Sequence, residues 1–402
     1  MRILFINHTF PGLFAPLAAA FGAESRHEVL FASSYGRQDL TIPGVRKIRL
    51  GSNEARARTA AAEMENMLTA GRQALHSFEK LKETGFVPDM VLSSASGGYA
   101  LFWETAFPDS FRVSWTESVP VMPDSRSASE PAFVRHLAQC RQAMGSTLSV
   151  CLTAGEQGFL SKRLRHAVEL PYAVDTSRFV GGRFDPQIQN DLNVTEVPEL
   201  LVLAVTRTQS SSPELVQVLL HLCAVRPQCH VVLFCDSMAT LNQMRTCCSE
   251  LPDPLAGRLH VSGMLSLNRY RTLMTMASAV VFPPGSRIQD LTLLEAMSCG
   301  AVLVLAKGCS VASFLQHEGN VFLLGEQSAP DFVHALEALL KEKELVRSVR
   351  IRARQTIVEH FALEKMLPLY VHFLEEMYTI WKEQGAAALP KALSEARLSR
   401  LF

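Results

Sequence analysis

The sequence predicts an α/β protein built from two doubly wound domains, each with a parallel sheet covered by helices on both faces. Short apolar runs, of the length of buried strands, alternate with longer helical patterns along most of the 402 residues. The alternation stops in a polar stretch at 175–199, which contains Gly181-Gly182 and two prolines, and then starts again. We therefore expect two separate series of strands and helices.

The first series begins at the N-terminus. Its expected strands cover 2–6, 29–32, 43–50, 90–92, 111–115 and 148–153. Its expected helices cover 14–21 and 55–83, and the longer one is rich in Ala, Glu, Met, Leu and Arg, which favour helices. The first residues also resemble a signal peptide, but Asn7, His8, Pro11 and Gly12 interrupt the apolar stretch and favour a strand, a loop and a helix.

The second series repeats the pattern. Its expected strands cover 200–205, 231–234, 259–261, 279–282, 302–305 and 321–324, and its expected helices cover 213–224, 238–249, 267–276, 291–299 and 331–341. A last helical pattern at 364–382 is so apolar that it needs a partner surface, so we expect it to return to the first domain. The expected domains are thus 1–175, 176–363 and 364–402, and we expect the tail after 384 to be loosely attached.

Composition excludes several classes of protein. The 39 basic and 39 acidic residues cancel, which excludes a polyanion-binding protein driven by bulk charge, and 48% hydrophobic residues exclude disorder. The sequence contains no run of 18 consecutive apolar residues, so we expect no membrane-spanning helix. Among the nine cysteines there is no Cys-x-x-Cys, and no Walker or G-x-G-x-x-G loop is present. We therefore expect a cytoplasmic protein with reduced thiols that is neither a P-loop ATPase nor an NAD dehydrogenase.

The most informative stretch is 280–305, with the sequence VVFPPGSRIQDLTLLEAMSCGAVLVL. A strand ends at Phe282, a polar loop follows, and Asp290 is placed to cap a helix. The free N–H groups and the dipole of a helix N-terminus favour an anion such as phosphate. Glu295, five residues further on, would accept hydrogen bonds from vicinal hydroxyls, as on a ribose; a solvated helix position is the other interpretation.

Several motifs resemble, in order and at suitable spacing, those of glycosyltransferase family four. Residues 294–304 resemble its LEAMACGxPVV signature, and 7–12 resemble the NHNFPGQF start of one bacterial branch. Weaker resemblances are at 107–109, 170–179 (the xxGVDxxxF motif) and 226–232 (RPDAHVV). The resemblance implies the GT-B fold, with two Rossmann-like domains facing across a cleft. It also implies transfer of a sugar from a nucleotide-diphosphate sugar, with retention of anomeric configuration and without a metal or other cofactor.

The resemblance places the donor on the second domain. Arg207 matches an arginine that would neutralise the leaving diphosphate, and Glu295 matches the glutamate that binds ribose. The family's lysine falls near Ser212 and its first glutamate on Arg287, so both are absent, as is an acidic residue near Ser313. Lys307 is a substitute cation, although each of these side chains could also be an ordinary surface residue. The remaining donor candidates are Ser210, Arg287, Asp290, Leu291 and Thr292.

The acceptor is expected on the first domain. The loop Phe10-Pro11-Gly12 follows the first strand, and Gly97-Gly98 follows the strand at 90–93. Glu117, after the strand at 111–115, is the strong acid or base of its loop, and His8 is the histidine nearest the expected cleft. Both are candidate catalytic residues, with a packed, hydrogen-bonded histidine as the other interpretation of His8.

We therefore expect a metal-independent retaining glycosyltransferase whose acceptor is a surface glycan, a lipid-linked sugar or a protein. We expect the protein in the cytoplasm, either free or in contact with the inner face of the membrane. We expect no nucleic acid partner. Because cations and an acid of the family are missing, a GT-B scaffold or partner subunit of an active transferase is the alternative function, followed by a nucleotide-sugar epimerase using Glu117. The basic clusters at 162–165 and 347–354 are expected to be solvated helix faces.

Overall fold

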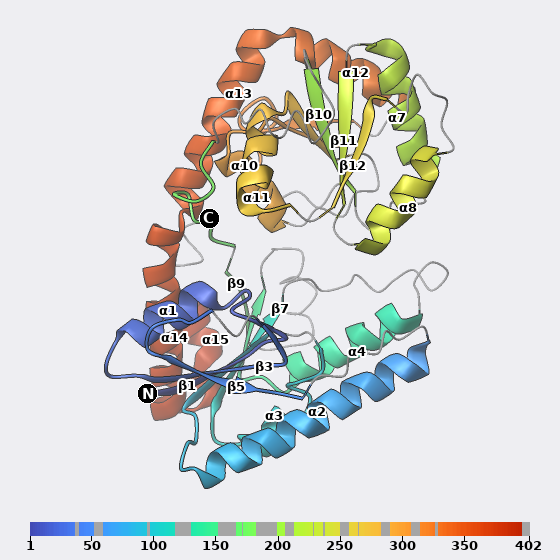
Figure 1. The fold of residues 1–402 in the computed structure, drawn as a ribbon. Coiled ribbons are helices and arrows are strands. Elements are labelled where there is room, and N and C mark those ends of the chain that lie inside the picture. The colour runs from blue at the N-terminus through green and yellow to red at the C-terminus, as the bar shows by residue number, and fades with distance from the viewer. Residues whose placement is uncertain are drawn as a thin grey trace. The chain divides into compact units, whose positions relative to one another are not determined.

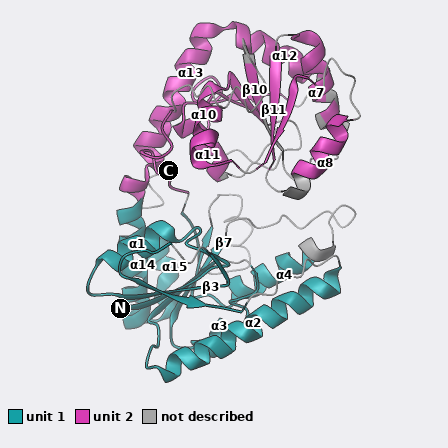
Figure 2. Cartoon of the chain, viewed as in Figure 1, with its two compact units in different colours: residues 1–171, 367–402 teal, residues 172–366 magenta. Residues whose placement is uncertain are grey.

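Residues 1–171 and 367–402 form one unit of the fold, and residues 172–366 form the other (Figure 2). The structure is a computed structural model. It describes residues 1–36, 40–51, 59–94, 97–116, 130–151, 166–170, 172–181, 199–205, 213–227, 229–235, 238–249, 257–263, 265–282, 290–306, 314–325 and 329–395.

The sheet of unit 1 has seven parallel strands in the order β5-β3-β1-β6-β7-β8-β9. Their bounds are β1 (Arg2–Ile6), β3 (Glu28–Ser33), β5 (Val45–Arg49), β6 (Met90–Ser94), β7 (Phe111–Thr116), β8 (Leu148–Cys151) and β9 (Ala167–Glu169). Strand β1 pairs with β3 on one side and with β6 on the other. The strand order therefore reverses between β1 and β6, and the carboxyl ends of these two strands form the topological switch point, where α/β sheets bind ligands.

Helices cover both faces of this sheet (Figure 1). They are α1 (Ala15–Ala23), α2 (Ala60–Glu83), α3 (Trp103–Ala106), α4 (Glu130–Met144), α14 (Leu363–Gln384) and α15 (Leu389–Glu395), with a 3₁₀ turn at Ala386–Ala388. Helix α14 packs on the sheet through Tyr378 and Trp381, whose rings lie 6.2 and 5.5 Å from that of Phe111. Leu389 is fully buried and anchors the tail, while most of residues 384–394 are exposed.

The sheet of unit 2 has six parallel strands in the order β12-β11-β10-β13-β14-β15. Their bounds are β10 (Glu199–Val205), β11 (Cys229–Cys235), β12 (Leu259–Ser262), β13 (Ala279–Phe282), β14 (Leu303–Ala306) and β15 (Phe322–Leu324). Strand β10 pairs with β11 and with β13, so the switch point of this unit lies at the carboxyl ends of β10 and β13.

Two apolar clusters cover the two faces of this second sheet. One cluster includes side chains of α7 (Pro213–Val225), α8 (Met238–Ser249) and α12 (Ala329–Lys341). The other includes α10 (Leu267–Met276), α11 (Asp290–Ser298) and a π-helical turn at Ile357–Phe361. Helix α13 (Lys343–Thr356) contributes Val349 to the first cluster and Ala353 to the second. Each face of the sheet is therefore a buried core, as a parallel sheet requires.

The predicted fold class is confirmed, and most expected strands and helices lie within a few residues of those observed. The elements that the sequence did not predict include β9, α4, α15 and the two-residue strands β2 (Thr9–Phe10) and β4 (Tyr35–Gly36). Helix α4 escaped detection because it exposes Phe133 and Leu137 while burying His136 and Gln142. Its polar and apolar positions therefore do not follow the usual amphipathic pattern.

The basic cluster at 347–354 is a solvated helix face only in part, because Arg347 and Arg352 are exposed whereas Arg350 and Arg354 are half-buried. Arg350 donates to the carbonyls of Thr275 (3.4 Å) and Ala277 (3.0 Å), which are left free where α10 ends. Arg354 donates to the carbonyls of Ser298 and Phe179. These arginines thus cap the ends of α10 and α11. The cluster at 162–165 lies outside the described residues.

Within the described part of the chain, no helix combines the length and the apolar character that crossing a membrane requires.

Candidate functional site

The switch point of unit 1 is built around the buried side chain of Asn7, which directly follows β1. Its Nδ2 donates to the carbonyl of Thr9 (3.0 Å), and its Oδ1 accepts from the Ser94 hydroxyl at the end of β6 (2.5 Å). Its backbone N–H donates to the carbonyl of Ala32 in β3 (3.1 Å). One residue thus connects the ends of three strands and fixes the start of the loop that follows.

Gly12 allows this loop to turn close to Asn7. Its φ is +48°, and a Cβ at this position would lie 2.2 Å from Asn7 Nδ2 and 2.7 Å from the carbonyl of Thr9. Only glycine fits such a conformation and such a distance without displacing its neighbours.

Phe10, also expected in the acceptor-side loop, is buried, with its ring edge-on to Phe31 at 5.0 Å. Phe10 therefore contributes packing, whereas half-buried Pro11 and exposed Gly12 form the accessible part of the loop.

His8 lies exposed between β1 and β2 and is held by three neighbours. Its Nδ1 lies 2.9 Å from the Ser34 hydroxyl, and its ring is nearly parallel to those of Tyr35 and Tyr99, with centroids 6.4 and 6.0 Å away. No described residue hydrogen-bonds its Nε2. The arrangement fixes the ring and leaves one nitrogen for a ligand, as a group in acid–base or hydrogen-bonding contact with a substrate requires.

Gly97 and Gly98 bring Tyr99 to this place. Their φ angles are +74° and +79°, and a Cβ on Gly98 would lie 2.7 Å from the carbonyl of Met67 in α2. Tyr99 itself is buried, and burial raises the pKa of its hydroxyl, so the hydroxyl stays protonated beside His8. The two glycines thus have a positioning role.

In unit 2, α11 directly follows the loop after β13 and begins beside the switch point. It starts at Asp290, one residue earlier than expected, so Asp290 belongs to the first turn and does not precede the helix. Leu291 and Thr292 are half-buried in the same turn. The N–H groups of this turn have no acceptor within the helix, which makes the turn a place for an anion.

Glu295 lies half-buried one further turn along α11, and the hydroxyl of Tyr270 from α10 lies 3.5 Å from the carbonyl of Thr292 in the same helix. Burial raises the pKa of this carboxyl group to about 7, and the nearby Tyr270 side chain partly opposes the rise. A half-buried carboxylate of this kind is a frequent feature of functional sites. Sequence reasoning found Glu295 but missed Tyr270, which lies 25 residues before it.

The remaining predicted residues lie outside the described ranges. These are Glu117, Arg207, Ser210, Arg287 and Lys307, together with the positions of the missing family residues, Ser212 and Ser313. Their roles stay predictions.

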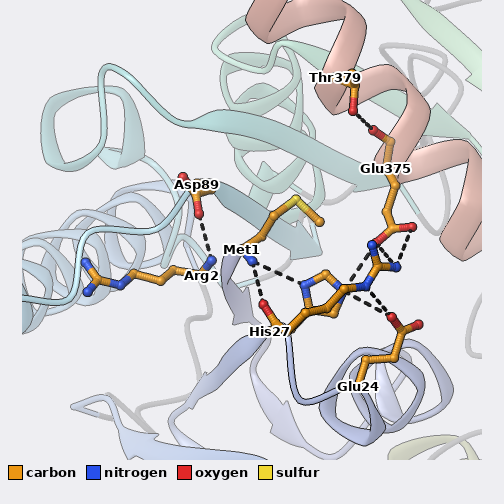
Figure 3. A network of polar contacts seen from close by, with 8 residues as sticks. Met1, Arg2, Glu24, His27, Asp89, Glu375 and Thr379 are labelled. Atoms are coloured by element: carbon orange, nitrogen blue, oxygen red, sulfur yellow. Dashed lines mark hydrogen bonds and ion pairs between the residues drawn. The ribbon is translucent and has the colours of Figure 1, made fainter.

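Glu24, His27 and Glu375 form the one group among the described residues whose side-chain atoms lie close enough together for a metal ion, within 4.8 Å of one another. Figure 3 shows this group, which lies in unit 1 before the amino end of β3. Arg26 donates to Glu24 Oε2 (2.5 Å) and lies 2.8 Å from Glu375 Oε1. A guanidinium therefore already pairs with both carboxylates, and the group lies at the opposite end of the strands from the switch point.

Two family models match the sequence, one in each unit. A model described as glycosyl transferase family 4 group matches residues 25–128, and a model described as glycosyl transferases group 1 matches residues 209–356. The second match includes α11 and Glu295. Both units therefore match glycosyltransferase models, which supports a glycosyltransferase similar to family four.

Comparison with solved structures shows that this chain has the GT-B fold. Sucrose-phosphate synthase from Thermosynechococcus elongatus superposes with a TM-score of 0.71 at 15% identity, covering 94% of this chain and 99% of that one. Alr3699/HepE from Anabaena, solved in complex with UDP-glucose, has a TM-score of 0.68 at 12% identity, covering 94% and 100%. A putative UDP-N-acetylglucosamine 2-epimerase from Listeria monocytogenes has a TM-score of 0.59 at 11% identity, covering 96% and 97%. The sequence matches no curated protein.

Proposed function

We propose that this glycosyltransferase moves a sugar from a nucleotide-diphosphate sugar to an acceptor, with retention of anomeric configuration. The observation that carries the proposal is half-buried Glu295 on α11, beside the switch point of unit 2 and within the motif LEAMSCG. The family match over 209–356 supports it, as does the complex of a protein of the same fold with UDP-glucose. A uridine nucleotide is therefore the first donor to test.

In this proposal unit 2 binds the donor. The carboxylate of Glu295 accepts hydrogen bonds from the two ribose hydroxyls, and the free N–H groups of the first turn of α11 bind a phosphate oxygen. Arg207, with Arg287 and Lys307, neutralises the diphosphate as its charge grows on departure. An interaction that strengthens in the transition state appears in turnover more than in ground-state binding. With these cations and the helix dipole, the reaction needs neither a metal nor another cofactor.

Unit 1 contributes the acceptor side. His8 Nε2, Pro11 and Gly12 would contact the acceptor or the transferred group, and Glu117 would supply an acid or base. A surface glycan, a lipid-linked sugar and a protein side chain are the acceptor classes to test. We place this reaction in the cytoplasm, with the inner face of the membrane as the location for a lipid-linked acceptor.

Two other functions each have one supporting observation. The absence of the family's lysine and first glutamate favours a scaffold or partner subunit that binds the nucleotide without turnover. The shared fold with a putative epimerase favours epimerisation of the nucleotide sugar itself. Product analysis separates the three functions. Transfer requires an acceptor, epimerisation gives a new nucleotide sugar without one, and a scaffold gives no product.

The test of the donor site is a thermal-shift screen with nucleoside diphosphates, followed by calorimetry with the best of them. A ligand at a hundred times its dissociation constant adds about 2.7 kcal/mol of stability, which such a screen detects. Glu295→Ala should weaken binding about ten- to a hundredfold, because charge-assisted hydrogen bonds to two hydroxyls are lost. Glu344→Ala, at an exposed position of α13, is the control. Unchanged affinity in folded Glu295→Ala would contradict the assignment.

A further inference from the structure

His8 and Ser34 lie beside each other, each directly before one strand of the short parallel pair β2 and β4. The backbone N–H of Tyr35 donates to the carbonyl of His8 (2.9 Å), which holds the two chain segments together at this point. Ser34 is buried, with 5% exposed, whereas His8 is exposed. The pairing of the two segments therefore fixes the Ser34 hydroxyl next to His8.

The Ser34 hydroxyl contacts His8 at two atoms. Its Oγ lies 3.1 Å from the carbonyl oxygen of His8 and 2.9 Å from Nδ1 of the imidazole ring. A carbonyl oxygen can only accept a hydrogen bond, whereas Nδ1 donates or accepts according to the tautomer of the ring. A serine hydroxyl has one proton, so it can donate to only one of these two atoms.

Both contacts become hydrogen bonds in one arrangement of the protons. The Ser34 hydroxyl donates to the carbonyl of His8, and Nδ1–H of His8 donates to Ser34 Oγ. The carbonyl has two lone pairs, so it can accept from Ser34 and from the Tyr35 N–H together. If the hydroxyl donated to Nδ1 instead, two oxygens would face each other at 3.1 Å without a proton between them. The Tyr99 hydroxyl lies 3.5 Å from Nδ1, which is long for a hydrogen bond, so Ser34 is the principal partner.

The tautomer decides what the other ring nitrogen can recognise. With the proton on Nδ1, Nε2 of neutral His8 carries a lone pair and can only accept a hydrogen bond. A hydroxyl group has a proton to donate to such a nitrogen, whereas an ionised phosphate or carboxylate has none. No described residue hydrogen-bonds this nitrogen, so a bound molecule can reach it.

We propose that Ser34 is a positioning residue that holds His8 in the Nδ1–H tautomer, so that Nε2 accepts a hydrogen bond from a hydroxyl group of the acceptor. The inference rests on the proposed function where it names the acceptor, because His8 must then contact that molecule. It deepens that function, since the group that His8 recognises is a neutral hydroxyl and not an anion. Ser34 acts through His8 and needs no contact with the acceptor.

The first measurement identifies the tautomer directly. Long-range ¹H–¹⁵N correlation spectra at about pH 8.5 distinguish Nδ1–H from Nε2–H in a neutral imidazole ring, and the His8 signals are identified by their absence from His8→Ala. We expect Nδ1–H in the wild type and a shift toward Nε2–H, the more stable form of a free histidine, in Ser34→Ala. Ser34→Thr keeps a hydroxyl and should keep Nδ1–H. Ser33→Ala, the same change at the neighbouring buried serine, is the control and should also keep Nδ1–H.

The second measurement tests the contact with the acceptor. Consumption of UDP-glucose with water, the simplest hydroxyl donor, should fall about three- to tenfold in Ser34→Ala, as expected for the loss of one neutral hydrogen bond. Ser34→Thr should restore the rate, and Ser33→Ala should react as the wild type does. In the His8→Ala background, Ser34→Ala should have no additional effect, because the group that it positions is gone.

Four results would overturn the inference. They are the Nε2–H tautomer of His8 in the wild type, an unchanged tautomer in Ser34→Ala, an unchanged rate in Ser34→Ala, and an additive loss of rate in the double variant. The first needs no variant, so it tests the inference even if Ser34→Ala does not fold. If the tautomer depends on Ser34 and the wild type consumes no UDP-glucose, the proposed function fails, whereas the role of Ser34 toward His8 stands.

Discussion

Arg26 lies 2.8 Å from Glu375, although 349 residues separate them in the sequence (Figure 3). Arg26 belongs to the turn between α1 and β3, and Glu375 lies on α14. The same carboxylate lies 3.2 Å from Nε2 of His27, whose side chain is only 1% exposed. The contact joins the C-terminal helix to the beginning of the chain within unit 1.

Glu375→Ala should lower the free energy of unfolding by about 1 kcal/mol. Arg26 is well exposed, so its ion pair alone contributes little, and most of the loss comes from removing the 3.2 Å contact between the Glu375 carboxylate and the buried His27 ring. Denaturant unfolding measures the change. Glu376→Ala, at the next and exposed position, should unfold as the wild type does, and an equal loss in both variants would contradict the interpretation.

Glu295→Gln should make the protein more stable above pH 7 while weakening its binding of the nucleotide. Burial raises the pKa of Glu295 from 4.5 to about 7, so between these values the folded state binds more protons than the unfolded state. Stability therefore falls as pH rises through this window, and the loss is complete above pH 7. We expect the variant to exceed the wild type by about 2 kcal/mol at pH 8 and to match it near pH 4.5.

Melting temperatures at the two pH values check this expectation, with Glu344→Gln as the exposed control. A difference that is the same at both pH values would show that the gain has another origin. A functional carboxylate that costs stability is the usual trade-off at a binding site.

The fold was predictable where each element carries its own signal. The buried strands around β1 and β10 are continuous apolar runs, and Glu295 stands in a motif that places it on a helix after a strand. The two series of strands and helices were therefore predictable from local sequence pattern, and Glu295 was predictable from the resemblance to a known family.

The contacts that complete the sites were not predictable, since they join residues far apart in the sequence. Asn7 bonds Ser94 across 87 residues, and Arg354 bonds Phe179 across 175. Neither residue type nor local spacing indicates such a pairing. Tyr270 is one more aromatic residue in a helix until the fold brings its hydroxyl to the carbonyl of Thr292 in α11, 3.5 Å away.

Gly12→Ala should destabilise unit 1 more than an alanine at another glycine of positive φ. Gly12 (φ +48°) leaves no room for a Cβ beside Asn7, whereas Gly85 (φ +86°) has open space around it. Gly85→Ala therefore measures the backbone strain alone, about 1–2 kcal/mol, and Gly12→Ala adds the displacement of Asn7. Denaturant unfolding of both variants gives the difference.

The same variant should lose turnover and keep its nucleotide affinity, because the loop belongs to unit 1 and Glu295 to unit 2. Equal stability of the Gly12 and Gly85 variants would mean that the contact between Gly12 and Asn7 does not constrain the loop.

Transfer should survive complete removal of divalent metal. The sequence has no Asp-x-Asp pair expected near the donor, and Arg26 already pairs with both carboxylates of the group Glu24, His27 and Glu375. A divalent ion needs several convergent oxygen ligands, so the charge of the leaving diphosphate falls instead to protein cations and to the first turn of α11. We would follow donor consumption in excess EDTA and then with added Mg²⁺, and expect equal rates. Loss of turnover on chelation, restored by the metal, would contradict this mechanism and assign the diphosphate to a metal ion.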